Sequence, residues 1–207
     1  MKRYLSIVAL ALIAAVPLVA QSAEGWKVRA DRSTSASDPD GAGEIKFMAM
    51  NGQFHAVNPQ AAVYWKPGST AMGTYTLMGT FTLNEPSDHT NYYGLVFGGS
   101  DLEGAGQSYT YFLVAQNGTY LVKKRMGDDK TENVVGKMPS DAIKKPGADG
   151  KSTNALEVRV GADTVEYVVN GTVVETTPKA GISTDGIYGI RVNHHLDVNI
   201  KDFGVRK

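Results

Sequence analysis

The sequence of 207 residues contains no cysteine. This absence excludes disulfide bonds, thiolate metal sites and a cysteine nucleophile. It also excludes a lipoprotein anchor, which needs a cysteine at the cleavage site. A domain without disulfides has to be stabilised by its hydrophobic core, and roughly 180 residues, the length left after a leader is removed, are enough for one domain of sandwich size.

The chain also lacks an excess of charge of either sign, because 21 lysine and arginine residues balance 21 aspartate and glutamate residues. Without Lys2 and Arg3, which belong to the leader predicted below, 19 basic residues stand against 21 acidic ones, a net charge near −2. Such a chain has no basic field that would attract nucleic acid or an anionic membrane. We therefore predict a small or neutral partner and no nucleic acid.

Long apolar runs are absent except at the N-terminus. Lys2 and Arg3 precede an apolar stretch over residues 5–19, and small residues follow at Ala20 and Ala23. The stretch is short for a membrane span and has the order of a secretory signal peptide. We predict a leader over residues 1–23, with cleavage after Ala20 as the alternative. The mature protein is then periplasmic or extracellular and is not inserted into a membrane.

The clearest feature that is present is a set of three Asn-Gly pairs, Asn51-Gly52, Asn117-Gly118 and Asn170-Gly171, each between two runs of strand-forming residues. Asn-Gly adopts positive φ at little cost, as a two-residue type I′ hairpin requires. No segment keeps a helical apolar period over three turns. Strands are predicted over residues 45–50, 53–57, 61–66, 74–83, 92–97, 109–116, 119–126, 155–160, 165–169, 172–176, 187–193 and 196–205.

These strands predict an all-β domain over residues 44–207, a two-sheet antiparallel β-sandwich of the jelly-roll type, because so many short strands bury their apolar faces only in stacked sheets or a barrel. Residues 24–43 are predicted to be a flexible segment before it. A two-residue turn after Gln116 would pair Leu113 with Val122 and Phe112 with Lys123. The face with Leu113 is nearly all apolar and is predicted to be core, whereas the mixed face with Phe112 is predicted to point outward.

Four stretches of sequence resemble a known family. NALEVRVGADTVEYVVNGTVV and DGIYGIRVNHHLDVNIKDFGVRK resemble the final strands of concanavalin A-like lectin/glucanase jelly rolls, and YYGLVFGG and YTYFLVAQNGTYLVKKR resemble their middle strands. More narrowly, the chain resembles the secreted 3-keto-disaccharide hydrolase domain family and laminin-G-like sandwiches. The resemblance covers roughly residues 47–207. It implies the jelly-roll fold and carbohydrate binding.

The sequence lacks the Glu-x-Asp-x-Glu alternation with which glycosidases of this fold place two carboxylates on one strand face. None of the eight glutamates begins such a motif. The turn at Asn170-Gly171 would set Glu166 opposite Glu175, with Arg159 beside them, and we interpret this as a surface row in which Arg159 offsets both charges. No catalytic residue is predicted. A hydrolase of keto-disaccharides or related glycosides and a structural or interaction domain without a small ligand are the alternatives.

No metal site or cofactor is predicted, although structural calcium is left open. His194 and His195 are neighbours and would point to opposite faces of a strand, and no spacing offers a further convergent ligand. The acidic segments 38–41, 101–103 and 128–129 resemble irregular calcium loops, but we interpret them as turn residues, for which Asp and Gly are well suited.

A sugar site usually combines an aromatic ring with planar polar side chains that hydrogen-bond the hydroxyl groups. Residues of these types fall on the predicted outer face of one sheet, so we predict a neutral glycan bound on its concave face. The arginines are expected to have no structural role, with Tyr92 as a stacking platform. The predicted ligand-binding residues are Tyr92, Phe112, Lys123, Arg125, Arg191 and Asn193, with Trp65, His55 and His194 at an edge or rim.

Overall fold

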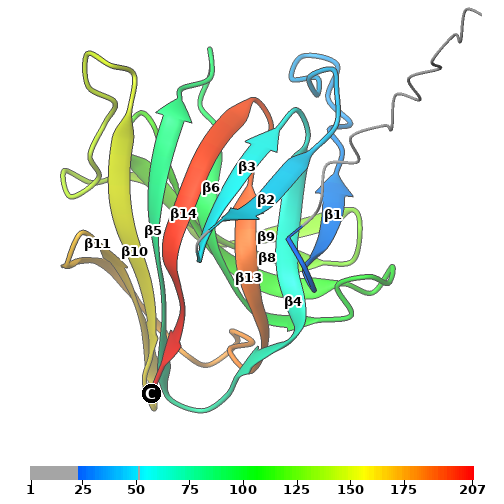
Figure 1. The fold of residues 1–207 in the computed structure, drawn as a ribbon. Helices are drawn as coiled ribbons and strands as arrows, with labels where there is room; N and C mark the ends of the chain where they lie inside the picture. The colour runs from blue at the N-terminus through cyan, green and yellow to red at the C-terminus, as the bar shows by residue number, and fades with distance from the viewer. Residues whose placement is uncertain (1–22, 51) are drawn as a thin grey trace, which may run out of the picture.

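The computed structural model describes residues 23–50 and 52–207 (Figure 1). Within them the chain is all-β, and two antiparallel sheets of seven strands are stacked as a sandwich. This confirms the predicted fold class. The described residues contain no helix that is long and apolar enough to cross a bilayer.

The first sheet contains β1 (Lys27–Asp31), β4 (Ala61–Ala71), β6 (Tyr92–Ser100), β7 (Ser108–Ala115), β8 (Thr119–Met126), β9 (Lys130–Pro139) and β13 (Gly186–Val192). Its strand order is β1-β4-β13-β6-β7-β8-β9. The second sheet contains β2 (Lys46–Met50), β3 (Gln53–Asn58), β5 (Tyr75–Glu85), β10 (Ser152–Val160), β11 (Thr164–Val169), β12 (Thr172–Pro178) and β14 (Leu196–Arg206). Its order is β12-β11-β10-β5-β14-β3-β2, and β10, β5 and β14 lie in front of β6 and β13 in Figure 1.

The main core lies between the two sheets. Large side chains from both sheets meet there without solvent exposure, among them Phe81 of β5, Phe97 of β6, Phe112 of β7 and Tyr167 of β11. The rings of Phe112 and Tyr167 lie 5.2 Å apart, centroid to centroid, across the interface. Burial of this apolar surface is what stabilises a domain without disulfides.

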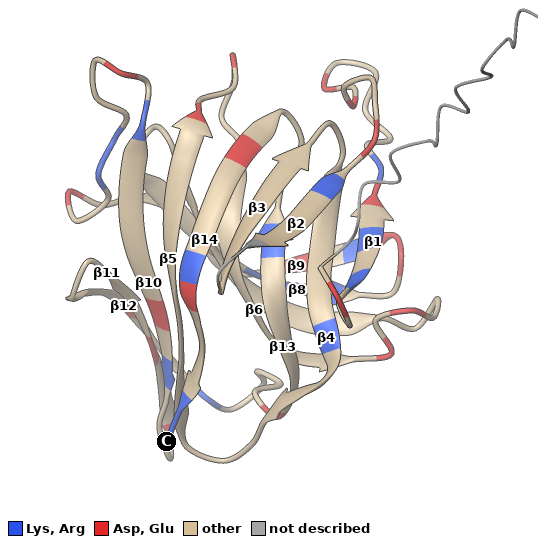
Figure 2. Ribbon diagram, viewed as in Figure 1, with Lys and Arg blue, Asp and Glu red and all other residues tan. Residues whose placement is uncertain are grey.

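Two strands were not predicted. β1 lies in the segment that the sequence analysis assigned to a flexible stretch, and it pairs with β4 so that Asp31 stands opposite Ala61. Figure 2 shows the basic and acidic positions that β1 carries. β9 pairs with β8 at the other edge and is mostly polar and exposed, as suits an edge strand that has to avoid pairing with other chains. Neither strand has the apolar alternation that sequence patterns detect.

The hairpin between β7 and β8 has a three-residue loop, and the predicted two-residue turn is wrong there. Gly118 adopts φ +83° and its N–H donates to the Ala115 carbonyl at 3.0 Å, an arrangement typical of a type I turn followed by a bulge. Leu113 therefore pairs with Leu121, one residue away from the prediction. A shift of one residue exchanges the two faces of a strand.

The Asn170-Gly171 turn is confirmed as type I′, since both residues have positive φ, and Val168 pairs with Val173 as predicted. A bulge between Tyr167 and Val168 then shifts the register, so that Glu166 faces Thr176 and the predicted Glu166–Glu175 pair does not form. The pairing of Arg159 with Glu166 is confirmed. The Asn51-Gly52 turn lies partly outside the described residues, although β2 and β3 pair Met50 with Gln53 beside it.

Candidate functional site

A groove runs over the outer face of the first sheet. Two adjoining cavities of about 310 and 410 Å³ form it and share six lining residues, so we treat them as one site, the first-sheet groove. These volumes fall in the range of small-ligand sites. Strands β13, β6, β7 and β8 supply its floor, and the loops around Asp38 and Asn91 supply its rim. The shared residues are Asp38, Asn91, Arg125, Thr131, Arg191 and Asn193.

Two arginines and one aspartate form the charged floor of the groove. Arg191 donates to Asp31 Oδ2 at 2.5 Å and to the Tyr109 hydroxyl at 3.0 Å. Arg125 donates to the same Asp31 oxygen and to the Asp128 carbonyl. Both arginine side chains are only 8% exposed. The expectation that these arginines have no structural role is therefore wrong, because each is buried and bound to a carboxylate that β1 supplies.

The ionisation of Asp31 follows from this arrangement. Burial by itself would raise the pKa of its carboxyl group, but the positive charges of Arg191 and Arg125 and their hydrogen bonds outweigh burial, so the pKa lies below the ordinary 3.8. Asp31 is thus a permanent anion between two cations at neutral pH.

Two lysines add positive charge at the other end of the groove. Burial, and then the nearby cations Lys137, Arg191 and Arg125, lower the pKa of Lys123 below its usual range. The Lys137 ammonium lies 5.6 Å from the centre of the Tyr92 ring. Among the described residues, neither lysine has a carboxylate oxygen within salt-bridge distance of its ammonium group. These two lysines leave this end of the groove with uncompensated positive charge.

The aromatic side chains of the groove are covered rather than exposed. Tyr92 and Tyr111 are 4% and 5% exposed, and the guanidinium carbon of Arg191 lies 5.3 Å from the centre of the Tyr111 ring. The groove therefore presents mainly hydrogen-bonding and charged groups. Two of its polar atoms, Arg125 Nε and Asn193 Oδ1, are buried without a partner among the described residues. Such atoms cost free energy until water or a ligand satisfies them.

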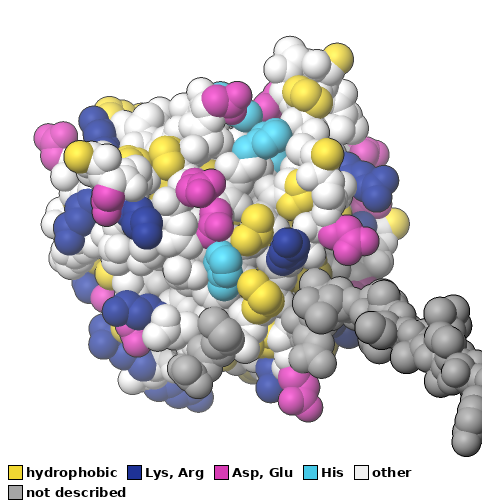
Figure 3. Space-filling model, turned by 45° about the horizontal axis from the view of Figure 1, so that its top comes forward, with side chains coloured by type: hydrophobic (Ala, Val, Ile, Leu, Met, Phe, Trp, Pro, Cys, Tyr) yellow, Lys and Arg dark blue, Asp and Glu magenta, His cyan; other side chains and the backbone are white. Residues whose placement is uncertain are grey.

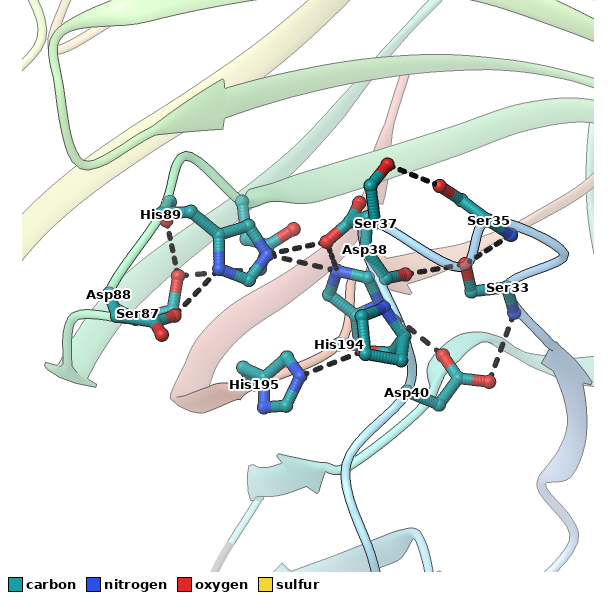
Figure 4. Close-up of polar contacts among 12 residues, drawn as sticks. Ser33, Ser35, Ser37, Asp38, Asp40, Ser87, Asp88, His89, His194 and His195 are labelled. Carbon is teal, nitrogen blue, oxygen red and sulfur yellow. Dashed lines mark hydrogen bonds and ion pairs between the residues drawn. The ribbon is translucent and has the colours of Figure 1, made fainter.

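Three loops meet at the rim of the groove and bring histidine and aspartate side chains together (Figure 4). Asp38 comes from the loop between β1 and β2, His89 from the loop between β5 and β6, and His194 from the turn between β13 and β14. Figure 3 shows histidines beside acidic side chains near the top of that view. The prediction that no further ligand converges on His194 is wrong, since His89 and Asp38 do so.

Six of the predicted site residues line the groove: Tyr92, Lys123, Arg125, Arg191, Asn193 and His194. The other three do not. The shifted register places Phe112 in the core with no exposure, so its assignment to the outer face is wrong. Trp65 is buried in a second apolar cluster under the outer face, and His55 lies on the second sheet, 2.8 Å from Asp197.

Sequence reasoning missed Asp31, Asp38, His89 and Lys137 as members of the site. Asp31 and Lys137 lie on the two unpredicted strands. Asp38 and His89 lie in different loops that are far apart in the sequence, one before β2 and the other before β6. The acidic segment containing Asp38 was interpreted as a turn, with a calcium loop as the alternative. Two other acidic segments noted for calcium hold carboxylates that are already paired, Glu103 with Lys27 and Asp128 with Arg29.

The sequence matches no protein-family model and no curated protein. Its structure is similar to solved structures at low sequence identity. The carbohydrate binding module CBM66 from Bacillus subtilis aligns with a TM-score of 0.61 at 10% identity, over 88% of this chain and 96% of that one. The carbohydrate recognition domain of Emp46p in a potassium-bound form aligns at 0.52 and 13% identity, over 87% and 88%.

A Bacillus subtilis protein with a galectin-like fold aligns with a TM-score of 0.50 at 13% identity, over 87% of this chain and 88% of that one. At such identities the likeness concerns the fold alone. It agrees with the jelly roll that the resemblance of the strand sequences implied. The chain has the concanavalin A-like sandwich fold.

Proposed function

We propose that this protein binds a carbohydrate in the first-sheet groove. The observation that carries the proposal is the groove itself, a polar hollow in which arginine, lysine and asparagine side chains converge over one sheet. Planar amide and guanidinium groups match pairs of sugar hydroxyl groups. The fold likeness to a carbohydrate binding module and to a carbohydrate recognition domain supports the same function by analogy.

The charge of the groove narrows the ligand class. The near-zero net charge of the chain favours a neutral glycan. However, Lys123 and Lys137 lie close together beside Arg125 and Arg191, and Asp31 pairs with the two arginines and with neither lysine. Crowded cations repel one another, and a bound anion relieves that repulsion. We therefore favour an oligosaccharide that carries carboxylate groups, such as one containing uronic acids.

Calorimetric titration of the exported protein with neutral and uronic-acid oligosaccharides of equal length tests this function. The acidic series should bind at least about tenfold more tightly, and the Lys123→Met variant should lose most of that preference. Lys201→Met is the matched control, because Lys201 is exposed on β14 in the other sheet and should change nothing.

Three results would count against the proposal. Absence of binding to either series would contradict carbohydrate binding. Equal affinity for both series would contradict the proposal that the lysines select acidic oligosaccharides. Chromatography of the mixture after incubation would reveal cleavage of the oligosaccharides, and cleavage would favour the hydrolase alternative over binding alone.

We also propose that the protein is exported and that its leader ends at Ala20. The leader lies outside the described residues, but Ala23 belongs to the core, is 4% exposed and donates its N–H to the Phe47 carbonyl at 3.1 Å. Cleavage after Ala23 would remove this buried residue. Mass spectrometry of the exported protein should therefore find Gln21 as the first residue, and a protein that begins at Glu24 would contradict the proposal.

A further inference from the structure

The histidine and aspartate cluster at the groove rim has the geometry of a metal site. Asp38 Oδ1 lies 2.8 Å from His89 Nε2 and 3.1 Å from His194 Nε2, and the two Nε2 atoms are 3.2 Å apart. The two imidazole planes are inclined by 64°, so the rings do not stack and their nitrogens converge on one point (Figure 4).

These separations can be compared with those around a bound ion. Metal–nitrogen and metal–oxygen bonds of about 2.1 Å place neighbouring ligands about 3.0 Å apart in an octahedral site and about 3.4 Å apart in a tetrahedral one. The three observed separations, 2.8, 3.1 and 3.2 Å, lie at or near these values. One ion can therefore contact all three atoms with little movement of the side chains.

The surroundings of both imidazoles provide a second, independent observation. His89 Nδ1 lies 2.6 Å from Asp88 Oδ1, and His194 Nδ1 lies 3.3 Å from Asp40 Oδ1. A carboxylate that accepts the Nδ1–H proton fixes the tautomer in which Nε2 carries the lone pair, and metal-ligating histidines usually have such a partner. The Asn91 amide nitrogen lies 3.0 Å from His89 Nε2, so a bound ion would take the place of this contact.

The loop that carries Asp38 and Asp40 is itself held in place. The Ser33 hydroxyl donates to the Asp38 carbonyl at 2.6 Å, and the Ser33 N–H donates to Asp40 Oδ2 at 3.0 Å. Exposure differs across the cluster: the His194 side chain is 8% exposed, whereas those of His89 and Asp38 are 39% and 48% exposed. The cluster is thus anchored at its base and open to an ion from solvent.

We propose that Asp38, His89 and His194 bind one divalent first-row transition metal ion, for which Zn²⁺ is the probe. Two imidazoles and one carboxylate suit such ions, whereas Ca²⁺ and Mg²⁺ prefer oxygen ligands. Three protein ligands leave at least one coordination position open. Because Asp38 and His194 also line the groove, that position faces the space where a ligand would lie. The site stands on its own geometry and does not depend on the carbohydrate proposal.

Calorimetric titration of the chelator-treated exported protein with ZnCl₂ tests the site. One ion should bind per chain, with no competition from excess Ca²⁺ or Mg²⁺. His89→Gln and His194→Gln should each weaken binding at least about 100-fold, and Asp88→Asn about tenfold through the orientation of His89. His55→Gln is the matched control, since that histidine also faces a carboxylate but lies on the other sheet.

A measurement on the unmodified protein guards against variants that fail to fold. Nitrogen-15 spectra of the imidazole rings should show the Nε2 resonances of His89 and His194 shifting with one equivalent of Zn²⁺, while those of His55 stay in place. Absence of binding, full binding by the His89→Gln, His194→Gln double variant, or shifts confined to other histidines would overturn the assignment. A hydrogen-bonded histidine pair around Asp38, without metal, would give the first of these results.

Discussion

The outer faces of the two sheets differ in what covers them. On the second sheet, β5 and β10 alternate strictly between buried and partly exposed residues, and the outward row carries small polar groups such as Thr82 and Thr153, whose hydroxyls are 2.9 Å apart. On the first sheet, β6 and β7 are buried almost throughout. Their outer face holds a second apolar cluster, which includes Trp65, Leu102 and Tyr109.

The difference shows how a sandwich makes a binding face. The outward residues of β5 and β10 are partly exposed to solvent, so they need only be polar. The first sheet is covered by its own loop: the Arg29 guanidinium donates to the carbonyls of Leu102 and Gly104 and holds the segment around them against the sheet. Charges on this face become buried, and buried charges need fixed partners. The groove is the part of this face that the covering leaves open.

The largest difference in stability between variants of the two faces should come from breaking their ion pairs. Asp31→Ala leaves Arg125 and Arg191 buried without their carboxylate and should lower the free energy of unfolding by about 3–5 kcal/mol. Glu157→Ala, which breaks the half-exposed pair with Arg159 on the second sheet, should cost about 1 kcal/mol or less. Urea unfolding measures both, and similar costs would mean that the two faces are energetically alike.

Asp31 should also make the stability of the first sheet depend on pH. The pKa of Asp31 is lower in the folded protein than the ordinary 3.8. Its contribution to stability is therefore complete well above 3.8 and is lost as the pH falls below 3.8 toward the lower folded-state pKa. The melting temperature of the parent protein should therefore fall more steeply than that of Asp31→Asn between about pH 5 and pH 3. Parallel curves would show that Asp31 does not carry this dependence.

The next largest change in stability should come from adding a side-chain carbon where two backbones are closely packed. A Cβ at Gly94 of β6, where φ is +157°, would stand 2.3 Å from the Phe112 carbonyl oxygen, whereas a Cβ at Gly204 of β14 meets nothing within 4 Å. Gly94→Ala should cost about 3 kcal/mol, because backbone cannot move aside as a flexible side chain does. Gly204→Ala should stay within about 0.5 kcal/mol of the parent. Thermal unfolding compares the two, and a tolerated Gly94→Ala would argue against close pairing of β6 with β7.

The smallest effects should come from the hairpin turns. Gly118 and Gly171 both have φ +83°, so Val at either position is forced into the left-handed region at about 1–3 kcal/mol. Gly118→Val should cost more, because its Cβ would stand 2.5 Å from Lys145 Cε, while that of Gly171 is free. Gly136 of β9, which has neither constraint, is the control. Equal melting temperatures for all three variants would contradict these turns.

Local sequence was sufficient for most of the strands. The twelve strands that were predicted are present, and the turn at Asn170-Gly171 has the predicted type, because alternation and turn chemistry are properties of neighbouring residues. The register of β7 and β8 was predicted wrongly because the loop between them has three residues rather than two. The hydrophobic pattern did not reveal the error, since both faces of β7 are apolar, with Tyr111 and Leu113 on one side and Phe112 and Val114 on the other. Where both faces are to be buried, hydrophobic pattern does not select one of them.

The candidate site was also predicted only in part, because its residues come from segments that are distant in the sequence. Lys123, Arg125, Arg191 and Asn193 were found because they are polar residues within strands. Asp31, which binds the two arginines, comes from an edge strand, and Asp38 and His89, which meet His194, come from distant loops. No periodicity marks a side chain in such segments as part of a site. A long-range contact leaves no trace in the sequence around either partner.

The sequence by itself determined an all-β chain without disulfides, its hairpins and the polar residues of its middle strands, since these depend on backbone preferences and on alternation along one segment. Only the tertiary structure decided which face of β7 is core, which carboxylate neutralises the two arginines, and that Asp38, His89 and His194 meet at one point. Those facts follow from how sheets stack and loops fold back, and stacking is fixed by the burial of surface over the whole domain rather than by any local stretch of residues.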